Sequence, residues 1–162
     1  MTAPPAGFEA ATLLVVHHSP GTAVPAMVDV ALDGARSDGL ERLRVVVVSS
    51  LEVTSADVLG AAGYLLATPA NLGYVSGALK HASDTTYNDA LNVTQGRPYR
   101  VLVHGKSDTD GALLGIRKIV TGLAWRAVAE PVAVIGSVEE RLDDCQEPVS
   151  YTHLTLPTKV TV

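Results

Sequence analysis

Short apolar runs alternate with longer amphipathic stretches along most of the chain. Five of the runs are nearly continuous in Val, Leu, Ile and Ala, a pattern typical of parallel strands that helices cover on both faces. We predict a strand over each run. The runs span residues 12–16, 44–48, 64–67, 99–103 and 132–135.

The stretches between these runs predict helices, because their apolar residues recur at helical spacing and capping residues precede two of them. Thr54 or Ser55 can cap the second helix, and Ser107 or Asp108 can cap the fourth. Strands that alternate with helices indicate βαβ units and an α/β fold with a parallel sheet. The predicted helices span residues 24–34, 54–60, 75–91 and 110–123.

The end of the chain breaks this pattern. Residues 137–147 begin a polar helix, which Pro148 ends after little more than two turns. Residues 151–159 (YTHLTLPTK) resemble the translation of a sequencing-adapter read. We expect one domain over residues 1–147 with a truncated last helix, and a foreign tail over residues 148–162. A genuine extra strand or a partner-binding arm is the alternative for the tail.

Composition narrows the class of protein. The 162 residues fit one compact domain, and 47% hydrophobic with 18% charged residues excludes an intrinsically disordered chain. A net charge of −5 without a basic run argues against nucleic-acid binding. The apolar runs are too short to span a membrane, and a lone cysteine, Cys145, fits a reducing compartment. We expect a cytoplasmic protein that binds no membrane, no nucleic acid and no metal.

Ligands of open parallel sheets bind beyond the carboxyl ends of the strands. The candidate binding segments are therefore the three loops that follow the first, third and fourth predicted strands. The first loop, residues 17–24 (HHSPGTAV), offers hydroxyl groups and the N–H groups of a helix start, which suit a phosphate. Its two histidines either add positive charge there or are a buried and a solvated residue at a strand end. The residues that we expect to bind the phosphate are Ser19, Gly21, Thr22, Ala23 and Val24.

The second loop, residues 67–77, carries the most informative motif. Its glycines allow close backbone approach to a flat ligand, and Leu72 and Tyr74 can supply an apolar wall. The stretch TPANLGYVSGALKHASD resembles the flavin loop and the following helix of the flavodoxin-like family. It is closest to the NAD(P)H-dependent quinone and flavin reductases of that family, whose pattern reads approximately TPxxFGxxSGxxKxFxD. The matching residues are Thr68, Pro69, Gly73, Ser76, Gly77, Lys80 and Asp84.

This resemblance covers about residues 12–147. It implies a flavodoxin-like three-layer sandwich with a five-stranded parallel sheet of order 2-1-3-4-5, FMN as the cofactor and NAD(P)H as a possible electron donor. It places the third loop, residues 104–111, at the other edge of the flavin through the backbone of His104 and Gly105. His104 itself either bonds flavin and donates a proton or is satisfied by backbone. The flavin contacts that it implies in the second loop are Thr68, Pro69, Ala70, Asn71, Leu72, Gly73 and Tyr74.

The sequence departs from the family pattern at several positions. Gly21-Thr22 inverts the middle of the usual S/T-x-T-G-x-T phosphate motif, and Val24 replaces its last hydroxyl. Leu72 stands where an aromatic residue is common, which weakens stacking on flavin. Ala82 replaces a bulky residue on the third helix, so we expect thin packing beneath the second loop.

These observations favour an FMN-binding oxidoreductase that passes electrons from NAD(P)H to a quinone, a flavin or a similar small-molecule acceptor. No side chain is assigned a catalytic role. Two alternatives stay open: a flavodoxin-type electron carrier without its own turnover, and a flavin-free relative with a regulatory role. A homo-oligomer is compatible with the resemblance, because family members often form dimers or tetramers. The chain lacks the G-x-x-x-x-G-K-S/T and G-x-G-x-x-G motifs of other nucleotide-binding sites.

Overall fold

The computed structural model describes residues 10–37 and 43–146. The tail over residues 148–162, for which the sequence predicted a foreign origin, lies outside the described residues. Within them the chain forms one sheet with the strand order β2-β1-β3-β5-β6, in which β4 also pairs with β3 and β7 with β5. The strands are β1 (Ala11–His17), β2 (Leu43–Ser49), β3 (Gly63–Asn71), β4 (Tyr74–Val75), β5 (Pro98–Gly105), β6 (Arg126–Ala127) and β7 (Val132–Ile135).

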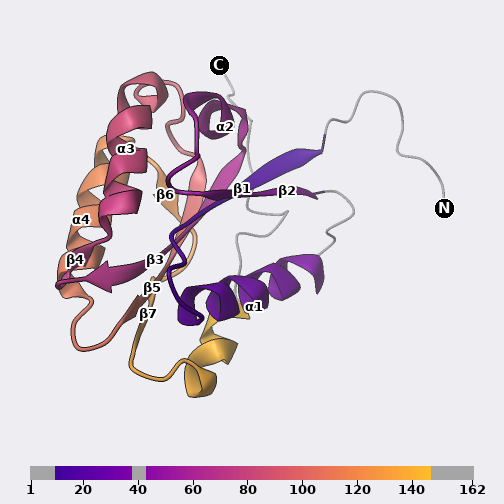
Figure 1. The fold of residues 1–162 in the computed structure, drawn as a ribbon. Coiled ribbons are helices and arrows are strands. Elements are labelled where there is room, and N and C mark those ends of the chain that lie inside the picture. The colour runs from indigo at the N-terminus through magenta and orange to yellow at the C-terminus, as the bar shows by residue number, and fades with distance from the viewer. Residues whose placement is uncertain (1–9, 38–42, 147–162) are drawn as a thin grey trace.

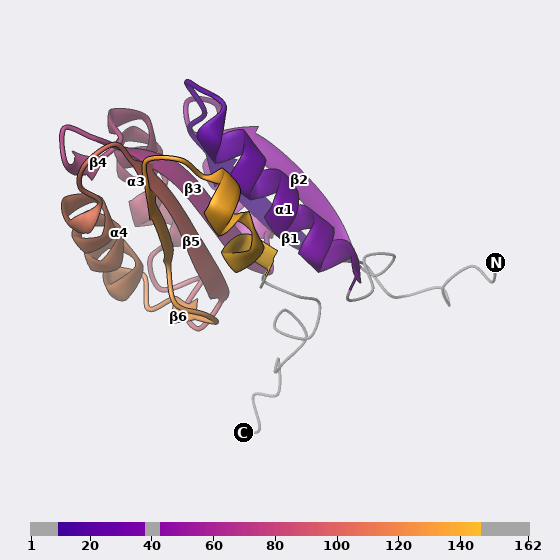
Figure 2. The ribbon, with the colours of Figure 1, turned by 90° about the horizontal axis from the view of Figure 1, so that it is seen from below.

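Helices cover both faces of this sheet, which gives a three-layer α/β sandwich (Figure 1). One face packs against α1 and a short 3₁₀-helix, η2, which lie side by side in both views (Figures 1 and 2). The opposite face packs against α2, α3 and α4. The helices are α1 (Ala23–Ser37), α2 (Ser55–Gly60), α3 (Gly77–Ala90), α4 (Asp110–Gly122) and η2 (Glu139–Gln146).

The predicted fold class is confirmed. All five predicted strands are present and pair in parallel, and β2-β1-β3-β5-β7 is the predicted order 2-1-3-4-5. The two-residue strands β4 and β6 were not predicted. Strand β4 turns back antiparallel on the end of β3, and β6 extends the parallel pairing of β5 near its start.

The central strands are buried on both faces, as their continuous apolar sequences predict. In β1, Leu13 and Val15 belong to the core under α1, whereas Leu14 and Val16 belong to the core under the other helices. The same alternation divides β3 between its two faces. Burial on both sides holds the strand ends in place, and the candidate site is built on those ends.

The helix starts agree with the sequence in one case and differ in another. Thr54 caps α2 as predicted, in a capping box where the Thr54 hydroxyl accepts from the Asp57 N–H and the Asp57 carboxylate accepts from the Thr54 N–H. The predicted cap of α4 at Ser107 or Asp108 is confirmed only in part. Thr109 holds the N-cap position, but the Asp108 carboxylate accepts from the N–H of Asp110, the first residue of the helix. The buried Thr109 side chain packs against Gly105 and makes no capping hydrogen bond.

A buried arginine holds the last helix against the sheet. The Arg100 side chain is 2% exposed, and its guanidinium donates to the carbonyl oxygens of Asp144 at 2.8 Å and Cys145 at 3.3 Å. These carbonyls belong to the last turn of η2, where a cation is favoured. Burial raises the pKa of the Cys145 thiol, so the thiol stays protonated at neutral pH. The truncated helix predicted at the chain end is therefore a short 3₁₀-helix, which Arg100 of β5 holds by hydrogen bonds to its last turn.

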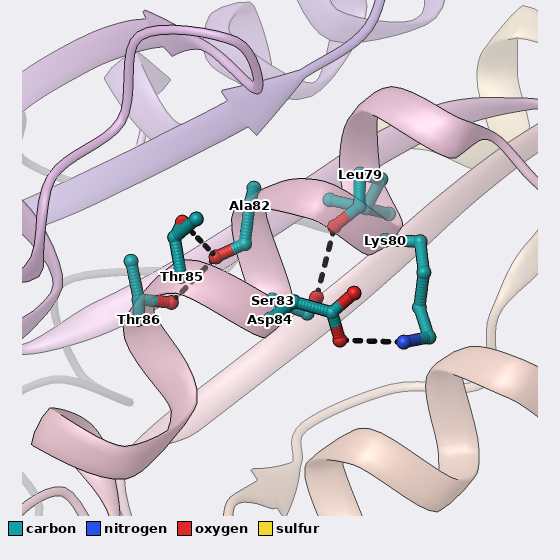
Figure 3. A network of polar contacts seen from close by, with 7 residues as sticks. All are labelled: Leu79, Lys80, Ala82, Ser83, Asp84, Thr85 and Thr86. Carbon is teal, nitrogen blue, oxygen red and sulfur yellow. Dashed lines mark hydrogen bonds and ion pairs between the residues drawn. The ribbon is translucent and has the colours of Figure 1, made fainter.

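A cavity of about 40 Å³ lies between α3 and the sheet. The buried face of α3 is built from small residues, and its hydroxyl groups bond back to the helix itself: Ser83 donates to the Leu79 carbonyl and Thr86 to the Ala82 carbonyl (Figure 3). These short side chains leave space beside Ala82. The thin packing that Ala82 predicted beneath the second loop is found instead between α3 and the sheet, because no residue of that loop lines the cavity. The apolar lining includes Val16, Val58, Leu66, Leu79, Ala82 and Trp125.

We predict that Arg100→Met lowers the free energy of unfolding by about 2 kcal/mol, because the buried Cys145 carbonyl and the half-buried Asp144 carbonyl lose their donor. Urea denaturation of the full chain measures this. Arg44, exposed on the edge strand β2, provides the matched control, and Arg44→Met should change stability by less than about 0.5 kcal/mol. Equal effects of the two substitutions would contradict the role of Arg100.

We predict that Ala82→Leu raises the free energy of unfolding by about 1 kcal/mol, since its added carbons enter the cavity under α3. The exposed neighbour His81 is the control, because a leucine there gains no burial. Thermal unfolding compares Ala82→Leu with His81→Leu. A lower melting temperature for Ala82→Leu alone would show that the space beneath α3 cannot accept a side chain.

Candidate functional site

The register of the strands brings the three predicted loops to one edge of the sheet. His17 of β1 lies opposite Ala67 of β3, and Pro69 of β3 lies opposite His104 of β5. The chain leaves β1 through α1 on one face and returns to β3 through α2 on the other. The strand order therefore reverses between β1 and β3, which is where open α/β sheets bind ligands.

The first loop presents hydroxyl and N–H groups at the start of α1. The Thr22 carbonyl accepts from the Ala26 N–H at 3.2 Å, which places the helix start at Thr22. Gly21 and Thr22 are exposed and Ser19 is half-buried. Val24 is 4% exposed and packs in the core, so only its backbone N–H can serve the loop. Pro25 follows and carries no N–H, which limits the helix donors to residues 23 and 24.

His17 contacts the first loop through a side-chain hydrogen bond. Its Nδ1 lies 2.9 Å from the Ser19 hydroxyl oxygen. Burial, and secondarily the neighbouring His18, lower the pKa of His17 below its usual value, so the imidazole is neutral at pH 7. Both histidines are half-buried, so the expected division into a buried and a solvated residue is not found. The His18 N–H donates to the Ala67 carbonyl at 3.0 Å and fixes the path of the loop out of the sheet.

The second loop is a tight hairpin with an apolar tip. Leu72 and Gly73 have φ angles of 52° and 77°, and the flanking Asn71 and Tyr74 pair as β3 and β4. Two central residues with positive φ are typical of a type I′ turn, in which a leucine costs about 1–2 kcal/mol. Leu72 is also 98% exposed and Tyr74 70% exposed. Neither backbone preference nor packing explains a leucine at this tip.

The base of the hairpin is tied to α3 by buried hydroxyl groups. The Thr68 hydroxyl oxygen lies 2.9 Å from the Ser76 hydroxyl and 2.9 Å from the Pro69 carbonyl. Ser76 caps α3 by accepting from the Leu79 N–H at 3.2 Å. Thr68 and Ser76 are fully buried, so Thr68 supports the loop from inside and can face a ligand only through its backbone. Pro69 and Ala70 are half-buried.

The lysine and aspartate of the same motif lie away from the hairpin tip. Lys80 and Asp84 form an exposed ion pair of 2.5 Å one helical turn apart on α3 (Figure 3). Such pairs add a few tenths of a kcal/mol to helix stability. Lys80 and Asp84 therefore stabilise α3, and they are not part of the candidate binding site.

The third loop is fixed to the turn after β7. The His104 Nε2 lies 2.6 Å from the Gly136 carbonyl oxygen, and the Gly136 N–H donates to the Gly105 carbonyl at 2.9 Å. His104 thus follows the alternative in which backbone satisfies it. A Cβ on Gly105 would lie 2.8 Å from the Asp108 carbonyl, so the turn requires glycine. Lys106 and the two residues after it are exposed.

The second and third loops touch each other. A Cβ on Gly111, in the first turn of α4, would collide with the Gly73 carbonyl oxygen. The Asp108 carboxylate, which accepts from the Asp110 N–H at 2.9 Å, lies near Gly73 as well. Neither Asp108 nor Gly111 was predicted as a site residue. A glycine inside a helix start, where it is costly, is the signal that could have revealed Gly111.

Within residues 10–37 and 43–146, no group of three or more His, Cys, Asp or Glu side chains is placed to hold a metal ion. No helix there is long and apolar enough to cross a membrane.

Comparison with known proteins gives matches in structure only. No family model and no curated protein sequence matches the chain. A flavodoxin from the domain Archaea superimposes with a TM-score of 0.70 at 14% identity, over 83% of this chain and 91% of that one. The flavodoxin of Streptococcus pneumoniae TIGR4 gives 0.68 at 22% identity, over 85% and 96%. The apo form of an NADH:FMN oxidoreductase gives 0.70 at 15% identity, over 93% and 92%.

These identities are low, and the similarity extends over most of both chains in each case. The comparisons therefore establish the architecture that the strand order and the layers already indicate. The chain has the flavodoxin-like fold.

Proposed function

We propose that this chain binds FMN and uses it to pass electrons from NAD(P)H to a small-molecule acceptor such as a quinone or a flavin. The observation that carries the proposal is the meeting of two unlike loops at the point where the strand order reverses. A helix start rich in hydrogen-bond donors follows β1, and an exposed apolar hairpin follows β3. Phosphate and aromatic ring need these two environments side by side.

The first loop fits a phosphate by its donor set. Ser19 and Thr22 supply hydroxyl groups, and Gly21, Ala23 and Val24 supply N–H groups at the positive end of the 15-residue helix α1. Nearby, the buried Ser50 hydroxyl has no hydrogen-bond partner within the described residues, and the Ser50 N–H donates to the carbonyl of His17. Buried hydroxyls without partners are uncommon, so the Ser50 hydroxyl is a further group at this edge that can form a hydrogen bond.

The second and third loops fit a flat ring. Leu72 and Tyr74 expose apolar surface that a ring would cover, and Gly73 lets backbone approach it. Pro69, Ala70 and Asn71 border the same turn, while Thr68, His104 and Gly105 contribute backbone. Bound FMN supplies the hydride and electron chemistry, and the chain binds and orients it. We assign no catalytic side chain.

The structural neighbours support the proposal of FMN binding, but they differ among themselves in activity. The archaeal and streptococcal proteins are described as flavodoxins, and the third as an NADH:FMN oxidoreductase. An electron carrier without its own turnover is therefore the second candidate. A flavin-free protein is the third, favoured by the buried Val24 side chain where the family has a hydroxyl.

We expect FMN fluorescence to be quenched on titration with the full chain, with a dissociation constant in the micromolar range or below. The reductase proposal further expects catalytic oxidation of NADH or NADPH when FMN and a quinone are present. FMN binding without NAD(P)H oxidation identifies the carrier. Absence of saturable quenching by a chain that melts cooperatively would refute FMN binding.

We predict that Leu72→Asn trades flavin affinity for stability. Asn-Gly is the preferred pair in a type I′ turn, so the free energy of unfolding should rise by about 1 kcal/mol. Loss of the apolar side chain should weaken FMN binding about fivefold, which corresponds to about 1 kcal/mol of apolar contact.

Ala124 provides the control for that variant. It follows α4 with a φ of 57°, far in the sequence from the three loops. Ala124→Gly should raise stability through the same relief of strain and leave FMN affinity unchanged. If Leu72→Asn stabilises the chain and still binds FMN as tightly as the wild type, the Leu72 side chain does not contact the flavin.

A further inference from the structure

We infer that His17 is a positioning residue for phosphate recognition, which decides whether the Ser19 hydroxyl donates its hydrogen to the phosphate or to the imidazole. The inference rests on the proposed function and goes beyond it, since it concerns how this chain compensates for an altered phosphate loop. The contact that carries it is the 2.9 Å separation of His17 Nδ1 from the Ser19 oxygen.

A serine hydroxyl has one hydrogen to donate. When Nδ1 of a neutral His17 carries no proton, the Ser19 hydroxyl donates to it and turns oxygen lone pairs toward the loop. A phosphate oxygen meets only an acceptor there. When Nδ1 carries a proton, the ring donates to Ser19 and the hydroxyl hydrogen is free for the phosphate. Phosphate binding therefore selects the forms of His17 that are protonated at Nδ1. Among them it favours the imidazolium over the neutral tautomer, because the positive charge attracts the phosphate.

The first loop has few groups that can donate a hydrogen bond to a phosphate. Val24 buries its side chain in the core, and Pro20 and Pro25 have no N–H to offer. Residues 19–24 contain no charged side chain. Ser19 is consequently one of two hydroxyl groups in the loop, and the imidazolium form of His17 would be the nearest source of positive charge.

The surroundings of His17 make its proton responsive to a bound anion. Burial lowers the pKa of His17, and the adjacent His18 lowers it further. The strands on either side place Ser49 and Ala67 opposite it, neither of which titrates in this range. The first turn of α1 holds no acidic residue. A phosphate at the loop is thus a new negative charge beside His17, and it raises the pKa of that residue.

The direction of the pH dependence follows from the pKa of His17 in the free protein and its higher pKa in the phosphate complex. Free protein holds His17 neutral above a pKa that lies below 6.5, and the complex holds it protonated up to a higher pKa. Phosphate affinity is therefore greatest below the lower value and falls as the pH rises toward the higher one. Each unit of separation corresponds to a tenfold change in affinity.

The test compares FMN with riboflavin, which lacks the phosphate. Fluorescence titrations between about pH 5.5 and pH 8 give the ratio of the two affinities for the wild type, His17→Asn and His18→Asn. The side-chain amide of Asn can still bond Ser19 and does not titrate. The phosphate of FMN titrates near pH 6 itself, but this contribution is shared by all three proteins and cancels between them.

We expect the FMN-to-riboflavin ratio of the wild type to fall about tenfold more across this range than that of His17→Asn. His18→Asn should keep a pH-dependent ratio, because the bond to Ser19 remains, but its fall should move to higher pH, because the variant lacks the His18 charge that lowers the pKa of His17. Equal slopes for wild type and His17→Asn would overturn the inference while leaving FMN binding intact. Failure of both flavins to bind would overturn the proposed function together with the inference.

A second measurement avoids substitution altogether. Nitrogen NMR of the wild-type histidines reports whether Nδ1 of His17 is protonated. Addition of FMN at pH 7 should shift this nitrogen toward the protonated form, and riboflavin should not. An unchanged Nδ1 signal in the FMN complex would contradict the proposed role.

Discussion

Every part of the candidate site depends on the parallel pairing of β1 with β3. Their register places His17 beside Ala67, and one more hydrogen bond, from the His18 N–H to the Ala67 carbonyl, carries the pairing to the start of the first loop. Both strands are buried on both faces, so a shift of register would expose apolar side chains. Core packing thereby sets the distance between the helix start and the hairpin.

The hairpin after β3 contains a strained backbone conformation, which the well-packed residues around it hold in place. Leu72 occupies a left-handed conformation and lies almost wholly in solvent, while Thr68 and Ser76 beneath it are buried and bonded. Gly111 removes the side chain that would push the turn away from α4. A rigid base under a strained apolar tip is the arrangement expected of a ligand contact held ready in advance.

Local patterns predicted the strands, helices and layer order, because burial on both faces leaves continuous apolar runs in the sequence. The hairpin strand β4 escaped prediction, since Leu-Gly is not one of the residue pairs that mark a type I′ turn. The bond from His104 to Gly136 joins residues 32 positions apart, and no local pattern encodes such a contact. The sequence did not reveal Thr109 as the N-cap of α4, because its side chain packs beside Gly105 and the Asp108 carboxylate next to it bonds the first N–H of the helix.

Backbone amide shifts in NMR spectra of the chain with and without FMN would locate the bound flavin residue by residue. If the three loops at one edge of the sheet bind it, the large shifts fall within residues 19–24, 69–74 and 104–106. Shifts centred on another face, or an unchanged spectrum at saturating FMN, would contradict binding by these loops.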